Sequence, residues 1–80
     1  MKNLKNLIAE MEIVRNEIHN RLSASELAKF DEIINDLRKL QEFPRGRDPE
    51  DLMFKALLVI GSVVVRDIVS EAIKKVLGNG

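Results

Sequence analysis

Hydrophobic residues in the first half of the chain recur at the spacing of a helix. They are separated by three or four residues, which places them on one face of a helix, and charged residues occupy the other faces. The first apolar set is Leu4, Leu7, Ile8, Met11, Val14, Ile18 and Leu22, and the second is Leu27, Phe30, Ile33, Ile34, Leu37 and Leu40. The pattern predicts two amphipathic helices, at about 3–22 and 24–43.

The junction between these two segments carries the signature of a helix start. Ser23 is followed three residues later by Glu26, the spacing of a capping box in which each side chain bonds the other residue's backbone N–H. Leu22 and Leu27 occupy the flanking positions of a hydrophobic staple. Because the connection is so short, we expect the two helices to form an antiparallel hairpin.

A second interruption precedes the last third of the chain. Pro44 disfavours a helical conformation at Phe43, and Asp48-Pro49 is typical of an N-cap followed by the first residue of a helix. Gly78 is well placed as a C-terminal cap. These signals predict a third helix at about 49–77, so the fold class is all-α and residues 1–80 form a single three-helix domain.

The segment from Leu52 to Val69 is apolar around nearly the whole circumference of the helix it is expected to form. Before Arg66 its only polar side chains are Lys55 and Ser62. Burying one large apolar side chain contributes about 1.5–3 kcal/mol, so leaving several of them in water would consume most of a small domain's stability. One helical hairpin covers about half of the surface of such a helix. We therefore expect a second copy of the chain to cover the other half.

The sequence therefore predicts a homodimer or higher oligomer with a mostly buried third helix. We place the oligomer interface on the middle of this helix, where two copies would meet around a two-fold axis. Its expected residues are Leu57, Ile60, Gly61, Val64 and Ile68.

An alternative for residues 57–65 is a β-strand, because Val59, Ile60 and Val63 to Val65 are good strand formers. No second strand is evident for it to pair with, and the flanking signals bracket one helix, so we prefer the helix. Gly61 costs that helix about 1 kcal/mol relative to alanine. We interpret Gly61 as a place where another helix crosses closely.

A membrane location for this segment is the less favoured alternative. The apolar run from Leu52 to Val65 contains Lys55, is shorter than the ~20 residues needed to cross a bilayer, and is followed by Arg66 and Asp67. The amino terminus shows no uninterrupted apolar segment of the kind found in secretory signals. We expect a cytoplasmic protein, and keep a small membrane-associated protein as a third hypothesis.

Charge and side-chain chemistry indicate no enzyme and no cofactor. Lys and Arg number 13 and Asp and Glu number 13, whereas proteins that coat nucleic acids usually carry a basic excess. There is no cysteine, His19 is the only histidine, and no glycine-rich phosphate motif is present. Our first hypothesis is a small non-enzymatic helical oligomer that acts as a protein-interaction, regulatory or inhibitory module, with itself and another protein as partners.

The loop before the third helix is the one candidate site for a charged ligand. Arg45 and Arg47 flank Gly46 just ahead of a helix start, whose free N–H groups attract anions. The second hypothesis is therefore a regulator that binds nucleic acid or a small anion through Arg45 and Arg47. The neighbouring acids Asp48 and Glu50 weaken anion binding, so we favour arginines that pair with nearby carboxylates.

Overall fold

The structure, a computed structural model, describes residues 4–43 and 48–78, and these residues are almost entirely helical. No strand occurs among them, which confirms the predicted all-α class. The helices are α1 (Leu4–Ile18), a short 3₁₀ helix (His19–Arg21), α2 (Ala24–Glu42), α3 (Pro49–Val59) and α4 (Val63–Leu77).

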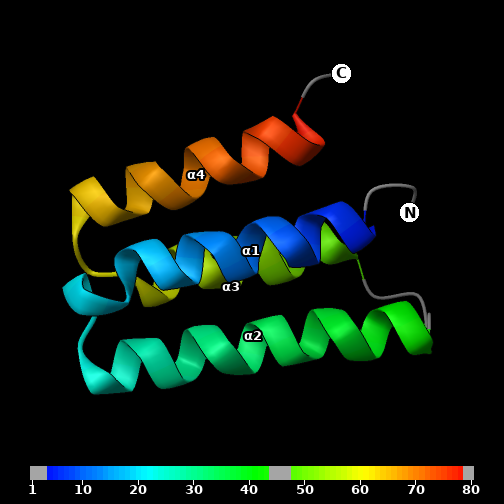
Figure 1. Ribbon diagram of the computed structural model, residues 1–80, viewed down its shortest axis with the longest axis horizontal. Coiled ribbons are helices and arrows are strands. Elements are labelled where there is room, and N and C mark those ends of the chain that lie inside the picture. The colour runs from blue at the N-terminus through cyan, green and yellow to red at the C-terminus, as the bar shows by residue number, and fades with distance from the viewer. Residues whose placement is uncertain (1–3, 44–47, 79–80) are drawn as a thin grey trace.

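Consecutive helices run in opposite directions and form an up-down-up-down bundle (Figure 1). The helix α1 packs against both α2 and α4, and α2 also packs against α3. The helices α1 and α3 lie diagonally opposite each other. Of the four neighbouring pairs, α3 and α4 pack least closely, which leaves the bundle most open along that side.

The predicted starts of α2 and α3 are present in the structure. At α2, the Ser23 hydroxyl accepts the Glu26 N–H at 3.1 Å and the Glu26 carboxylate accepts the Ser23 N–H at 2.9 Å, which completes the capping box. At α3, the Asp48 carboxylate accepts the Glu50 N–H at 3.0 Å, and Pro49 follows as the first helical residue.

The core is formed by the apolar faces of all four helices, and none of the described polar side chains is buried. Leu22 and Leu27, the expected staple residues, are only partly buried. The buried core residues are Leu4, Leu7, Ile8, Met11, Val14, Ile18, Phe30, Ile33, Ile34, Leu37, Leu40, Leu52, Met53, Ala56, Ile60, Val65, Val69 and Ala72. The helical spacing of the first two segments therefore identified their buried faces correctly.

The predicted third helix at 49–77 is wrong as a single element, because the chain turns sharply at residues 60–62. The helix α3 ends at Val59, Ile60 and Ser62 have extended backbone conformations, and α4 begins at Val63. The strand considered for residues 57–65 is also absent. The β-branched run thus surrounds a turn between two antiparallel helices.

The length of the first hairpin explains why the chain turns. At 1.5 Å per residue, a helix from 49 to 77 would be roughly 43 Å long, whereas the 19 residues of α2 extend roughly 28 Å. A continuous helix would therefore extend beyond the apolar surface of the α1–α2 hairpin. Turning back brings Ile60, Val65 and Val69 into the common core, where each is at most 2% exposed.

Local interactions stabilise this turn. Gly61 disfavours a continuous helix, and the Ser62 hydroxyl accepts the Val65 N–H at 3.3 Å as the N-cap of α4. The Arg66 guanidinium also donates to the Ile60 carbonyl oxygen at 2.8 Å. The backbone groups left free where α3 ends and α4 begins thus find side-chain partners.

The bundle covers the apolar segment from Leu52 to Val69 only in part, and buries Leu52, Met53, Ala56, Ile60, Val65 and Val69. Its accessible area is 5308 Å², close to the roughly 4,900 Å² that a typical monomeric protein of 9.1 kDa exposes. Among the apolar side chains of the segment, Phe54, Leu58, Val63 and Val64 stay more than half exposed, so self-association through this segment stays a prediction. Association of the folded chain would use the apolar side chains of this segment that the bundle leaves exposed.

One carboxylate joins the two turns at the same end of the bundle. Besides its bond to Ser23, Glu26 accepts the Gly61 N–H through Oε2 at 2.8 Å. The backbone N–H groups of Ser23 and Gly61 lower the pKa of Glu26 from its ordinary value. A Cβ atom at Gly61 would lie 3.3 Å from this oxygen, so the glycine permits close approach of a carboxylate and not of a crossing helix.

We predict that Glu26→Gln lowers the midpoint of thermal unfolding by several degrees at neutral pH, because the charged acceptor shared by two turns is lost. The folded-state pKa is lowered, so the contribution of the carboxylate is complete above the ordinary value of 4.5 and disappears as the pH falls through the lowered value. The difference between the two proteins should therefore shrink at acidic pH. Circular dichroism melts from pH 7 to pH 2 measure this, and a pH-independent difference would contradict it.

A second prediction separates the core from the surface of the turn region. Ile60→Asp should lower the free energy of unfolding by about 3 kcal/mol or more, because it places an unpaired charge in a dry core. Val64→Asp should change it by less than about 0.5 kcal/mol, because Val64 is 62% exposed and an acid suits the first turn of a helix. Urea unfolding of both variants tests this, and equal destabilisation would show that the assigned burial is wrong.

Candidate protein-interaction surface

The five residues predicted for the oligomer interface do not lie on one surface. Leu57 lines a groove between α3 and α4, whereas Ile68 lines a different groove between α1 and α4. Ile60 is fully buried in its own bundle, Gly61 lies in the turn beside Glu26, and Val64 is exposed. The turn between α3 and α4 separates residues that a continuous helix would have aligned.

The exposed large hydrophobic residues indicate a different surface. Most of them lie on α3 and the first turn of α4, while one lies on α1 and one at the end of α2. They are Phe54 (65% exposed), Leu58 (69%), Val63 (66%), Val64 (62%), Ile13 (55%) and Phe43 (63%). The α3–α4 hairpin therefore carries the main concentration of uncovered apolar side chains.

The helix α3 is apolar on two opposite sides. Leu52, Met53 and Ala56 point into the bundle and are at most 2% exposed. Phe54 and Leu58 are one helical turn apart, so they lie next to each other on the outer side. A helix with an apolar outer stripe is expected where another surface covers it.

An apolar groove adjoins this stripe between α3 and α4. It has a volume of about 240 Å³, and its apolar walls include Phe54 and Leu57 from α3 and Ile73 and Leu77 from α4. The volume is below the ~300–1,000 Å³ typical of small-molecule pockets, which favours protein side chains as its occupants.

Val63 belongs to the same side of α4 as this groove. It precedes Leu77 by two heptads, and residues at that spacing share one side of a helix. We refer to the combined surface as the α3–α4 face, which consists of Phe54, Leu57, Leu58, Val63, Ile73 and Leu77.

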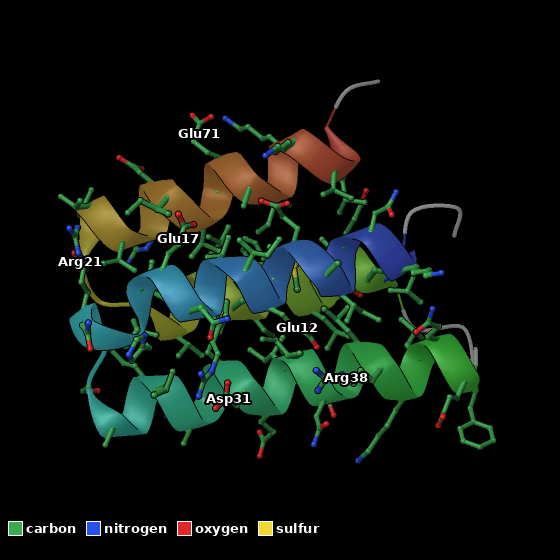
Figure 2. All side chains as sticks on the ribbon, viewed as in Figure 1. Glu12, Glu17, Arg21, Asp31, Arg38 and Glu71 are labelled. Atoms are coloured by element: carbon green, nitrogen blue, oxygen red, sulfur yellow. The ribbon has the colours of Figure 1, made fainter. Side chains whose placement is uncertain are left out.

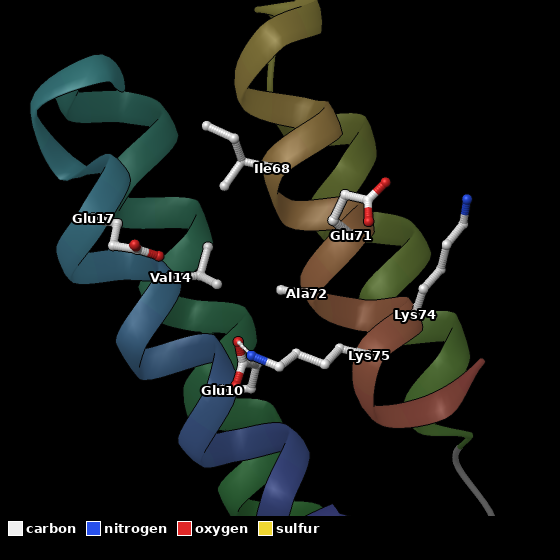
Figure 3. A pocket seen from close by; sticks show the side chains of 8 residues that line it. All are labelled: Glu10, Val14, Glu17, Ile68, Glu71, Ala72, Lys74 and Lys75. Atoms are coloured by element: carbon white, nitrogen blue, oxygen red, sulfur yellow. Dashed lines mark ion pairs between the residues drawn. The ribbon is translucent and has the colours of Figure 1, made fainter. Parts of the chain in front are cut away.

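A second groove, between α1 and α4, is more polar (Figure 3). It has a volume of about 440 Å³, with Val14, Ile68 and Ala72 among its lining residues. Lys75 Nζ lies 3.9 Å from Glu10 Oε2, so an ion pair of the chain itself already bridges the two walls. This groove is less suited than the α3–α4 face to an apolar partner.

The surface between α1 and α2 is occupied by ion pairs within the chain (Figure 2). Arg15 contacts Asp31 with two nitrogens, at 2.7 and 3.2 Å, and Arg38 pairs with Glu12. Solvent screens these partly exposed pairs, so they contribute little to stability, but they satisfy the polar groups of this side. Among the described residues, no salt bridge involves α3.

The remaining candidate partners of this chain are an anion, a metal ion and a membrane. Arg45 and Arg47 lie outside the described residues, so the anion-binding hypothesis stays a prediction. Within the described ranges, no group of three or more His, Asp or Glu side chains could hold a metal ion. None of the described helices combines the length and apolar character that a membrane crossing needs.

Comparisons with protein-family models, with curated proteins and with solved structures find no match to this chain. A functional assignment must therefore come from the chemistry of the surface itself. Phe54 and Leu58, two of its three strongly exposed members, were missed from the sequence because a continuous third helix was expected. The adjacent Gly61 and Ser62, a weak helix former followed by an N-cap residue, are the signal that could have revealed the turn and hence the outer stripe.

Proposed function

We propose that this protein is a small non-enzymatic interaction module whose contact surface is the α3–α4 face. The observation that carries the proposal is the pair Phe54 and Leu58, exposed by 65% and 69% beside an apolar groove. Contiguous apolar surface of this kind marks contact sites, and an aromatic residue is a frequent energetic centre of such sites. The partner is a second copy, a different protein, or both in turn.

The energetics favour a protein partner. Fully burying one large apolar side chain contributes about 1.5–3 kcal/mol, so covering Phe54, Leu58 and Val63 offers a substantial gross gain before the cost of association is subtracted. A groove between two antiparallel helices accepts an amphipathic helix, whose apolar residues repeat at three- and four-residue spacing. The occupant we expect is therefore helical.

A module of this kind acts by binding. It would regulate or inhibit a larger protein by occupying one of its helical surfaces, in the cytoplasm as the sequence leads us to expect. The polar side of the bundle, where Arg15 pairs with Asp31 and Arg38 with Glu12, would stay in solvent during such binding.

The contact surface is tested with the double variant Phe54→Asp plus Leu58→Asp. We expect it to lose the complexes formed by the wild-type protein, because two charges would enter the apolar contact. Light scattering on the pure protein measures self-association, and affinity capture from cell extract measures binding to other proteins. Circular dichroism should show an unchanged bundle, because both positions are exposed.

The matched control is Ile13→Asp, which places the same charge at an exposed hydrophobic position on α1, away from the α3–α4 face. This variant should keep every complex of the wild-type protein. The proposal fails if the wild-type protein forms no complex in either assay, or if the double variant keeps them all.

A further inference from the structure

The charged residues that line the groove of the α3–α4 face lie at one of its ends. Glu50 at the start of α3 and Lys74 near the end of α4 line opposite walls of the groove. They lie at the same end of the bundle because the two helices are antiparallel (Figure 1). At the other end, Leu58 lies in the last turn of α3 and Val63 is the first residue of α4, and both are exposed. The face thus carries an acid and a base beside Ile73 and Leu77 at one end, and an exposed apolar pair at the other end.

This distribution distinguishes two ways of pairing the face with a copy of itself. A two-fold axis perpendicular to the helices would place Glu50 against the apolar end of the second copy. Glu50 would then face Leu58 and would not meet Lys74, so it would lose water without the acid–base contact that the other arrangement offers. A two-fold axis parallel to the helices leaves corresponding ends of the two faces next to each other. It places α3 of one copy against α4 of the second copy.

With the axis parallel to the helices, both ends of the face find complementary residues on the second copy. This axis places Glu50 opposite Lys74 of the second copy, and Lys74 opposite Glu50, so that two equivalent ion pairs form. It also places Leu58 opposite Val63 of the second copy, and Val63 opposite Leu58 of the second copy, so the apolar contact occurs twice as well. The contacting helices α3 and α4 stay antiparallel, as they are within each bundle. The apolar contacts supply affinity, and the ion pairs select the orientation.

We propose that the occupant of the α3–α4 face is a second copy of this chain, related by a two-fold axis parallel to the helices, with Glu50 and Lys74 as the residues that select it. This inference rests on the proposed function, since it uses the same face. The formal net charge of the chain is zero at neutral pH, so no overall repulsion opposes the association of two copies.

The test uses two single charge reversals, Glu50→Lys and Lys74→Glu. Each variant alone places like charges opposite each other at two points and should weaken self-association by about tenfold or more. In an equimolar mixture, each heterodimer places the lysines at positions 50 and 74 of the first variant opposite the glutamates at positions 74 and 50 of the second. The mixture should therefore form heterodimers with about the affinity of the wild-type homodimer, as measured by sedimentation velocity with one variant fluorescently labelled.

The mixture also separates recognition from folding. Glu50 and Lys74 lie in the first and last turns of their helices, where their charges stabilise the helix ends, so each reversal also destabilises its own helix slightly. Mixing two variants cannot repair such a defect, but it restores opposite charges across an interface. Lys29→Glu and Glu32→Lys, on the exposed surface of α2, are matched reversals that should leave association unchanged alone and in mixture.

The possible outcomes are distinct. A wild-type protein that stays monomeric at millimolar concentration overturns the second copy as occupant, while the proposed function survives if Phe54 and Leu58 still bind another protein. A dimer that ignores both charge reversals overturns the orientation and the role of Glu50 and Lys74. A dimer that persists after Phe54→Asp plus Leu58→Asp overturns the α3–α4 face as the dimer surface, and the proposed function fails with it if the double variant also keeps every complex with other proteins.

Discussion

The structure depends on the limited length that one helical hairpin can cover. The hairpin of α1 and α2 offers an apolar surface roughly 28 Å long, and the apolar segment after Pro49 would be much longer if it continued as one helix. The turn at residues 60–62 divides this segment into two helices of suitable length, and both then pack on the same core. The longest dimension of the molecule, 31 Å, reflects this match. Burial in the core and the weak helix propensity of Gly61 thus act in the same direction.

The fold was predictable from the sequence where side-chain chemistry specifies a local structure. Ser23 with Glu26, and Asp48 with Pro49, identified two helix starts because their bonds form between residues that are neighbours in sequence. The turn at Gly61 was not predicted, because its strongest stabilisation is non-local. The Glu26 carboxylate that binds its N–H lies 35 positions away in sequence, and the core that receives Ile60 is built mostly by other helices. The predicted interface assumed that residues 57–68 share one helix, and the same turn distributes them over α3, the turn and α4.

The composition of α3 links the fold to the proposed activity. A helix in a four-helix bundle needs one apolar stripe, and Leu52, Met53 and Ala56 supply it. Phe54 and Leu58 add a second stripe that the bundle does not use. Because the core is complete without them, their exposure costs the fold little and leaves them available to a partner. The excess of apolar side chains in this segment lies on the outer side of α3 and continues into the first turn of α4, where Val63 and Val64 are exposed.

The bond between Glu26 and Gly61 has a consequence for the motions of the bundle. It fastens the turn between α3 and α4 to the start of α2, so neither turn can open without breaking a contact that the other uses. The opposite end, where α2 finishes and α3 begins, has no such carboxylate bridge among the described residues. The two turns should therefore open together, and the amide protons near Ser23 and Gly61 should exchange with solvent at similar rates. The end of the face that carries Leu58 and Val63 would then be rigid before any partner arrives, which reduces the entropy lost on binding.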